Sequence, residues 1–211
     1  FLLEGITNIR DAGLRRNALN KVEDNRKILQ FWVKDGAKRK LPKERLFAHL
    51  AIESNLREPF KRLADTGLRL NVLHTVERIQ TFLVEEATEL SGGERVMLIL
   101  EQDGKREVAE SILPLPSYQS GKGYEKAEDP KDVLKRIGKY LDQAKKTRVV
   151  QLLEARGKTK EGSLSRIIAP LIAQNQVLGY LYVDMDALYG KFDDTDRDML
   201  GMLANQGAVA L

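Results

Sequence analysis

The sequence predicts an α+β fold, in which an antiparallel β-sheet of five to six strands carries packed helices and follows a helical extension. Two observations lead to this prediction. About the first 90 residues have the apolar spacing of helices, and strand-like runs joined by short turns make up much of the remainder. Several of these runs follow one another directly, whereas a doubly wound parallel sheet needs a helix between each pair.

The first helix is expected over residues 6–33, which have helical spacing, and Asp35-Gly36 is expected to end it. Much of the net charge of +4 lies in the next stretch, "KDGAKRKLPKER" at 34–45. Pro42 within it suits the first turn of a second helix. We interpret the stretch as a solvated turn between helices, with contact to nucleic acid or anionic lipid as the alternative.

Two further helices are expected before the sheet. From Leu56, apolar or small residues recur at positions 56, 60, 63, 67 and 70, a heptad-like rhythm that favours helix packing. Pro59 is expected to bend or interrupt this helix. An apolar stripe of 3.6-residue period over 72–90 predicts the next helix, which the Ser-Gly-Gly at 91–93 terminates.

The sheet is expected to begin with "RVMLILEQ" and "KREVAESIL", because Asp103-Gly104 between them is a strong signal for a two-residue hairpin. An irregular loop rich in Pro, Gly and Ser follows, and then an amphipathic helix over 131–146. "TRVVQLL", "SRIIAPLIA" and "VLGYLYVDM" predict three more strands, the last two joined around "QNQ". A helix over 195–211 closes the chain, with Asp194 or Thr195 as its cap.

The stretch "SRIIAPLIAQNQVLGYLYVDM", followed by "GKFDDTDRDMLGMLANQGAVAL", combines four features in order. These are a strand with Pro170-Leu171, a strand over 177–184, a loop from Phe192 to Asp196, and a small-residue helix. In this order they resemble the GAF domain family, a sensor domain of bacterial signalling proteins. The resemblance covers about residues 72–211, behind a helical linker over 1–71. It implies the GAF-like sheet with packed helices, but it does not identify a ligand.

Four aspartates lie close together at the start of the last helix, at positions 193, 194, 196 and 198. An EF-hand calcium loop needs Gly at its sixth position and Glu at its twelfth, and neither possible register supplies them. We therefore interpret the aspartates as a helix cap and solvated charge and not as a metal site.

Members of the family that bind cyclic nucleotides carry an Asn-Lys, a Phe and an Asp-Glu. Lys191, Phe192 and Asp196 stand in similar places here, but the Asn is missing and Arg197 follows the aspartate. A bound cyclic nucleotide is therefore not expected. A short structural ion pair between Lys191 and Asp196 is the alternative role for these residues.

Several other kinds of site are excluded by composition. The chain has no cysteine, which removes disulfides, thiolate zinc sites and thioether-linked bilins. His49 and His74 lie in helical patterns without a partner constellation, so neither haem nor a catalytic histidine is expected. "QSGKGY" lacks the first glycine of a phosphate-binding loop. No apolar run is long enough for a membrane segment.

If a small molecule binds, the expected place is the concave face of the sheet beneath the 114–148 segment. The candidate lining residues are Tyr118, Tyr124, Arg148, Ser165, Arg166 and Tyr182. The alternative is that these residues fill or edge a closed domain that binds nothing.

These observations favour a cytoplasmic regulatory domain cut from a larger multidomain signalling protein. Binding of a small molecule or partner would shift the helices around 45–91 and 195–211, and these would act on an output domain in the same chain. A homodimer through the helices is expected, and catalysis, a cofactor and nucleic-acid binding are not. The alternative function is a ligand-free structural dimerisation module.

Overall fold

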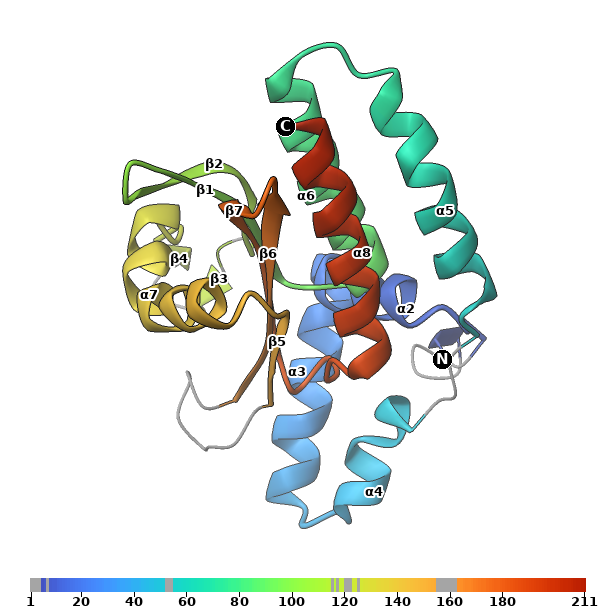
Figure 1. Ribbon diagram of the computed structural model, residues 1–211. Coiled ribbons are helices and arrows are strands. Elements are labelled where there is room, and N and C mark those ends of the chain that lie inside the picture. The colour runs from blue at the N-terminus through green and yellow to red at the C-terminus, as the bar shows by residue number, and fades with distance from the viewer. Residues whose placement is uncertain are drawn as a thin grey trace.

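A five-stranded sheet lies at the centre of the protein, as the computed structural model in Figure 1 shows. The structure describes residues 5–6, 8–51, 55–114, 116, 118–119, 123–124, 126–154 and 163–211. The strand order is β2-β1-β7-β6-β5, and every neighbouring pair is antiparallel. The strands of this sheet are β1 (Arg95–Gln102), β2 (Lys105–Ile112), β5 (Gln151–Leu153), β6 (Leu164–Ala173) and β7 (Gln176–Asp186). The predicted α+β fold is confirmed.

Helices make up most of the remaining described chain. They are α2 (Ala12–Asn20), α3 (Glu23–Lys38), α4 (Lys43–Leu46), the short 3-10 helix η1 (Ala48–Leu50), α5 (Arg57–Asn71), α6 (Val76–Ser91), α7 (Pro130–Thr147) and α8 (Asp194–Ala210). A separate two-stranded pair is formed by β3 (Tyr118–Gln119) and β4 (Gly123–Tyr124). No helix in the described part of the chain is both long enough and apolar enough to cross a membrane.

The two predicted hairpins form as tight two-residue turns. Asp103 and Gly104 have φ values of +52° and +75°, and Gln174 and Asn175 have φ values of +48° and +65°. Positive φ at both central residues is the geometry whose twist matches that of antiparallel strands. These local signals therefore set the register next to each turn, and an irregularity farther along shifts it between Leu98 and Ile99 and between Leu171 and Ile172.

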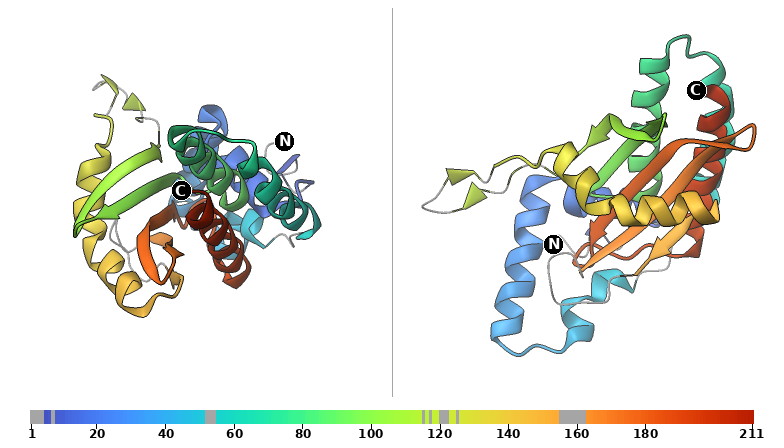
Figure 2. Two further views of the ribbon diagram at one scale, coloured as in Figure 1. Left: turned by 45° about the horizontal axis from the view of Figure 1, so that its top comes forward. Right: turned by 60° about the vertical axis from the view of Figure 1, so that its left-hand side comes forward.

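The sheet separates two apolar layers (Figures 1 and 2). Successive side chains of a strand point to opposite faces. Leu98 and Leu181 accordingly belong to the core beneath α6 and α8, whereas Ile99 and Tyr182 belong to the core beneath α7. Any small-molecule site on the α7 face is thus one sheet thickness away from the C-terminal helix.

The N-terminal helices share the larger of these cores. Leu19 of α2, Leu29 of α3 and Leu63 of α5 pack in the same cluster as the sheet residues Leu98 and Leu181. The division of the chain near residue 72 stays a prediction about its organisation. Within the described residues, the helices before that point fold onto the sheet and the helices that follow.

Three details of the predicted N-terminal helices are wrong. Residues 6–33 do not form one helix, because α2 ends at Asn20 and α3 begins at Glu23. Asp35-Gly36 does not end α3. Gly36 lies inside the helix, where a Cβ would come within 2.2 Å of Leu46 Cδ2, so the glycine permits close packing of α4. Pro59 does not interrupt α5 because it occupies the first turn, where proline is tolerated.

The cap of α8 is Asp193, and not Asp194 or Thr195 as predicted. The Asp193 side chain accepts a hydrogen bond from the Asp196 backbone N–H, and the Asp196 side chain accepts one from the Asp193 N–H. This reciprocal capping box satisfies two of the unpaired donors at the helix start. Asp194 and Asp198 are exposed and form ion pairs with Arg197.

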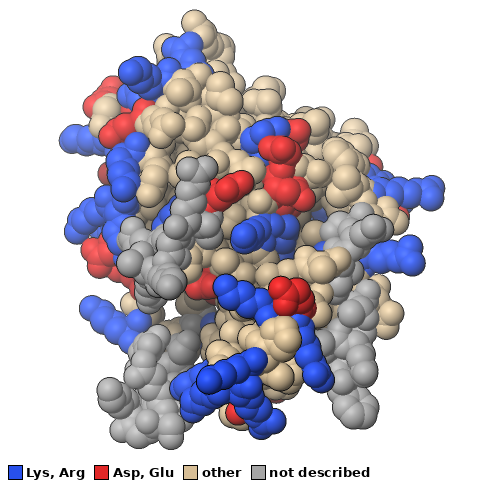
Figure 3. Space-filling model, turned by 90° about the horizontal axis from the view of Figure 1, so that it is seen from below, with Lys and Arg blue, Asp and Glu red and all other residues tan. Residues whose placement is uncertain are grey.

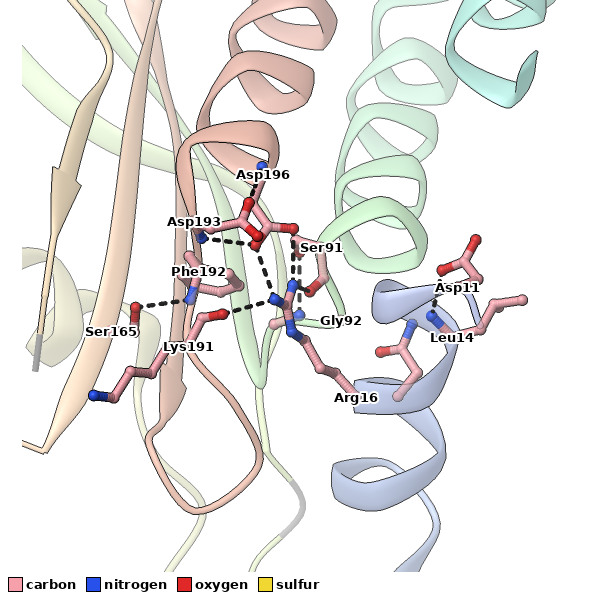
Figure 4. Close-up of polar contacts among 12 residues, drawn as sticks. Asp11, Leu14, Arg16, Ser91, Gly92, Ser165, Lys191, Phe192, Asp193 and Asp196 are labelled. Carbon is pink, nitrogen blue, oxygen red and sulfur yellow. Dashed lines mark hydrogen bonds and ion pairs between the residues drawn. The ribbon is translucent and has the colours of Figure 1, made fainter. Parts of the chain in front are cut away.

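Asp196 pairs with Arg16 of α2 and not with Lys191 (Figure 4). The Arg16 Nη1 and Nη2 atoms donate to the two carboxylate oxygens at 2.8 and 2.9 Å. The same guanidinium donates to the backbone oxygens of Ser91 and Lys191. The Asp196 side chain is 3% exposed. One arginine therefore joins α2 to the ends of α6 and α8.

Candidate ligand-binding site

A cavity of about 120 Å³ lies between α7 and the sheet. Its walls come from β1, β6, β7, α7 and the segment before α7, and its lining residues are Arg95, Glu128, Val133, Arg136, Ile137, Tyr140, Leu164, Arg166, Tyr182 and Asp184. Apolar side chains of α7 cover one side, and polar side chains of the sheet cover the other. This is the combination expected of a site for a small polar molecule.

Strand register explains why charged groups meet on this wall. Asp184 of β7 lies opposite Arg95 of β1 on one side and opposite Arg166 of β6 on the other. Residues directly opposite each other in antiparallel strands share a face of the sheet. The three side chains therefore form one row, Arg95–Asp184–Arg166, in the cavity wall.

The row is buried and held by hydrogen bonds. Asp184 is 2% exposed, and its Oδ1 accepts from Arg95 Nη1 at 2.6 Å while its Oδ2 accepts from the Tyr182 hydroxyl at 2.5 Å. The guanidinium of Arg166 lies 5.5 Å from the centre of the Tyr140 ring on α7. Burial raises the pKa of the Asp184 carboxyl, and Arg95 opposes that effect.

A second carboxylate lines the cavity. Glu128, just before α7, accepts hydrogen bonds from Arg95 of the sheet and Arg136 of α7. Burial acts to raise the pKa of Glu128, but these two arginines outweigh it and lower the pKa. Glu128 therefore stays ionised and ties α7 to the sheet at one end of the cavity.

The predicted site residues differ in where the structure places them. Arg166 and Tyr182 line the cavity. Ser165 does not, because it faces the opposite layer, where its hydroxyl accepts a hydrogen bond from the Phe192 backbone N–H at 3.1 Å. Arg148 lies at the C-terminal end of α7 in a left-handed conformation and donates to the side chain of exposed Asn175. Tyr118 and Tyr124 pair across β3 and β4, and their side chains lie outside the described residues.

The sequence-based prediction missed Arg95, Glu128, Arg136, Tyr140 and Asp184. A signal was present for two of them. Arg95 and Asp184 are charged residues inside or at the edge of otherwise apolar strands, and a charge there needs a partner because burial of an unpaired charge is expensive. The α7 residues have no such signal, because an amphipathic helix shows the same sequence pattern whether its inner face lines a cavity or covers a closed core.

No group of three or more acidic, histidine or cysteine side chains that could hold a metal occurs among the described residues.

The sequence matches the family model of the GAF domain over residues 74–211, about two thirds of the chain. The chain belongs to the GAF domain family. The match begins in the segment that leads into α6 and includes every strand of the sheet and α8.

Solved structures of GAF domains share the fold at low sequence identity. The GAF domain of an Acinetobacter phosphoenolpyruvate-protein phosphotransferase is 14% identical, with a TM-score of 0.53, and the match covers 74% of this chain and 93% of that one. The corresponding domain from Coxiella burnetii is 16% identical, with a TM-score of 0.51 and coverage of 74% and 94%. No curated protein matches the sequence.

One similar structure is an enzyme. Free methionine-R-sulfoxide reductase from Neisseria meningitidis, solved with its substrate, is 16% identical, with a TM-score of 0.53 and coverage of 72% and 87%. GAF domains are generally regulatory and occur in sensor and signalling proteins, and the family membership of this chain supports such a role. The fold alone does not exclude catalysis.

Proposed function

We propose that this GAF domain is the regulatory part of a larger cytoplasmic signal-transduction protein and that it does no chemistry itself. It binds a small organic anion in the cavity beneath α7 and passes the change to an output domain in the same chain. The observation that carries the proposal is the buried row Arg95–Asp184–Arg166 in the wall of a partly open cavity. Buried ion pairs often contribute little net stability, because apolar side chains of similar size pack as well, so charges in a cavity wall favour a binding role.

The charge of the cavity favours an anion. Arg95, Arg136 and Arg166 contribute three positive charges, and Glu128 and Asp184 contribute two negative charges, which leaves one positive charge in excess. Guanidinium groups bind carboxylates and phosphates in a bidentate way, and Tyr140 and Ile137 offer apolar contact to the rest of a ligand. The small volume favours a compact carboxylate or phosphate compound.

Strand β7 connects the cavity to the C-terminal helix α8. Tyr182 and Asp184 face the cavity, whereas Val183 and Met185 belong to the core beneath α8. The chain then runs from the end of β7 through a short connection into α8. A ligand that displaces Asp184 from its partners therefore acts on the strand that leads into α8, and it shifts the population of α8 positions.

A thermal-shift screen with small carboxylates and phosphates tests the proposal. We expect at least one compound to raise the unfolding temperature of the wild type and to lose that effect in Arg166→Gln. Arg148→Gln is the matched control, because it removes an exposed arginine outside the cavity. Stabilisation by no compound, or equal stabilisation of both variants, contradicts the proposal.

A second candidate function is the ligand-free dimerisation module, favoured by apolar side chains exposed on the two outer helices. Leu68 of α5 is 70% exposed and Val209 of α8 is 85% exposed. A homodimer through these helices would cover them. Light scattering should then show a dimer that Leu68→Ser with Val209→Ser dissociates, while Val149→Ser on the connection after α7 does not.

A further inference from the structure

One end of the molecule carries a concentration of basic side chains that the cavity does not explain. The C-terminal half of α3 and the whole of α4 extend beyond the sheet (Figures 1 and 2). Viewed from that end, Lys and Arg side chains outnumber Asp and Glu (Figure 3). We call this end the α3–α4 tip, and its exposed basic residues are Lys34, Lys38, Arg39, Lys40, Lys43 and Arg45.

Most of this charge is not neutralised within the described protein. Arg39 pairs with Asp35 one helical turn earlier. Lys34, Lys38, Lys40, Lys43 and Arg45 form no ion pair with another described residue. The only acidic residues within positions 34–45 are Asp35, which pairs with Arg39, and Glu44. Uncompensated like charges repel one another, so their concentration at one tip favours an anionic partner.

The exposed face of α3 also presents apolar side chains among the lysines. Lys27, Phe31, Lys34 and Lys38 recur at the spacing of one helix face. Phe31 is 70% exposed and the adjacent Ile28 is 51% exposed. A large aromatic side chain held in water between lysines has no structural use in the described fold, and it suits insertion into an apolar boundary.

We propose that the α3–α4 tip binds the surface of an anionic phospholipid membrane. Clusters of four to eight basic residues on an amphipathic helix attract anionic lipid headgroups, and exposed Phe or Leu side chains enter the boundary between headgroups and acyl chains. The tip extends beyond the sheet, and four of its six exposed basic residues are lysines, which suits a flat, diffuse negative surface. Nucleic-acid recognition would instead call for stacking aromatics beside a basic groove or for base-reading arginines.

Vesicle sedimentation of the full chain tests this binding. We expect association with vesicles of phosphatidylcholine and phosphatidylglycerol, none with phosphatidylcholine alone, and loss of binding at high salt because salt screens the lysines. Since each lysine near such a surface contributes roughly a fivefold change in affinity, Lys34→Gln, Lys38→Gln and Lys43→Gln together should weaken binding about 100-fold. Phe31→Ser should weaken it about tenfold and leave the salt dependence unchanged.

The matched control removes the same charge from another face. Lys131→Gln, Lys135→Gln and Lys139→Gln change three exposed lysines of α7 and should leave vesicle binding within about threefold of the wild type. All of these positions are exposed, and circular dichroism checks that each variant is folded. Equal loss in both triple variants overturns the proposal. Binding to single-stranded RNA without binding to the anionic vesicles also overturns it, in favour of a nucleic-acid surface.

Discussion

The buried ion pair between Arg16 and Asp196 is expected to contribute strongly to the stability of the protein. The pair is bidentate, and Asp196 takes part in the capping box of α8. The Arg16 donors also satisfy two backbone oxygens, one at the end of α6 and one in the connection before α8. Replacing one partner of such a pair leaves the other charge buried without compensation. We therefore expect this ion pair to affect stability more than the surface pairs between described residues do.

The substitution Asp196→Asn tests this at the residue scale. It keeps the size of the side chain but leaves Arg16 without its anion, so we expect a loss of about 3 kcal/mol in the free energy of unfolding. Urea denaturation followed by circular dichroism measures it. Asp198→Asn, two residues later and exposed, should change stability by less than about 0.5 kcal/mol. Similar losses in both variants would show that the Arg16 pair is unimportant.

Lys21 gives a prediction about pH. Burial, reinforced by Arg95 and Arg26, lowers the pKa of Lys21 to about 8, although Glu94 and Asp184 oppose the shift. Its Nζ donates to the Glu94 backbone oxygen at 2.7 Å. The unfolded chain keeps this proton up to its ordinary pKa of about 10.4, so between these values the unfolded state binds more protons than the folded state. Stability due to Lys21 therefore rises with pH across this window.

The size of that rise is measured against variants. Between pH 8 and pH 10 the unfolding free energy of the wild type should increase by about 2 kcal/mol more than that of Lys21→Met, which has nothing to titrate. Lys34→Met, which removes an exposed lysine, should follow the wild type. A pH dependence that is unchanged by Lys21→Met would mean that Lys21 titrates normally.

At the scale of elements, close contact between strands depends on Gly179 of β7. A Cβ at this position would lie 2.2 Å from the backbone oxygen of Ile99 on β1. The backbone cannot move away without breaking the β1–β7 pairing. Gly179 therefore permits the close approach of β1 to β7.

Gly179→Ala should therefore destabilise the protein by about 3 kcal/mol, a cost typical of overpacking at a rigid site. Gly138→Ala is the matched control. Gly138 lies in α7, and a Cβ added there would have no heavy atom within 4 Å, so alanine should stabilise the helix by about 0.5–1 kcal/mol. Thermal unfolding distinguishes the opposite signs, and a stabilised Gly179→Ala would contradict the packing argument.

The elements that the sequence predicted correctly are those with local causes. The hairpin at Asp103-Gly104, the end of α6 at Gly92 and the apolar strands all depend on neighbours within a few residues. The wrong predictions concern positions where contacts between residues far apart in the sequence determine the local structure. Gly36 signals a turn locally, but Leu46 of α4 makes it an interior helix residue.

The candidate site could be predicted only in part for the same reason. Arg166 and Tyr182 could be named because the sequence predicts their strands and the segment that covers one face of the sheet. Ser165, next to Arg166, was assigned to the same site although the alternation of side chains along a strand places it in the other layer. The partner of Asp196 lies 180 residues away in the chain, and no pattern in a single sequence connects the two.

On the scale of the whole molecule, the N-terminal helices and the GAF domain form one core. Leu19, Leu29 and Leu63 are 1%, 0% and 3% exposed within it. Gly13 of α2 is so close to α6 that a Cβ would lie 2.4 Å from the backbone oxygens of Glu89 and Leu90. The family match begins at residue 74, but because of these contacts we expect the stable folding unit to begin earlier in the chain.

A fragment covering residues 72–211 tests this argument. It retains the sheet but exposes the surface that α2, α3 and α5 cover, and it removes Arg16. We expect the free energy of unfolding of the fragment, measured with urea, to be at least about 3 kcal/mol lower than that of the full chain. We also expect the fragment to bind the hydrophobic dye ANS.

The decisive comparison is Asp196→Asn in both backgrounds. In the full chain the substitution should be strongly destabilising, because a buried arginine loses its partner. In the fragment, where Arg16 is absent, it should be neutral or slightly stabilising because it removes an uncompensated carboxylate. The same loss in both backgrounds would show that Asp196 acts through the capping box alone.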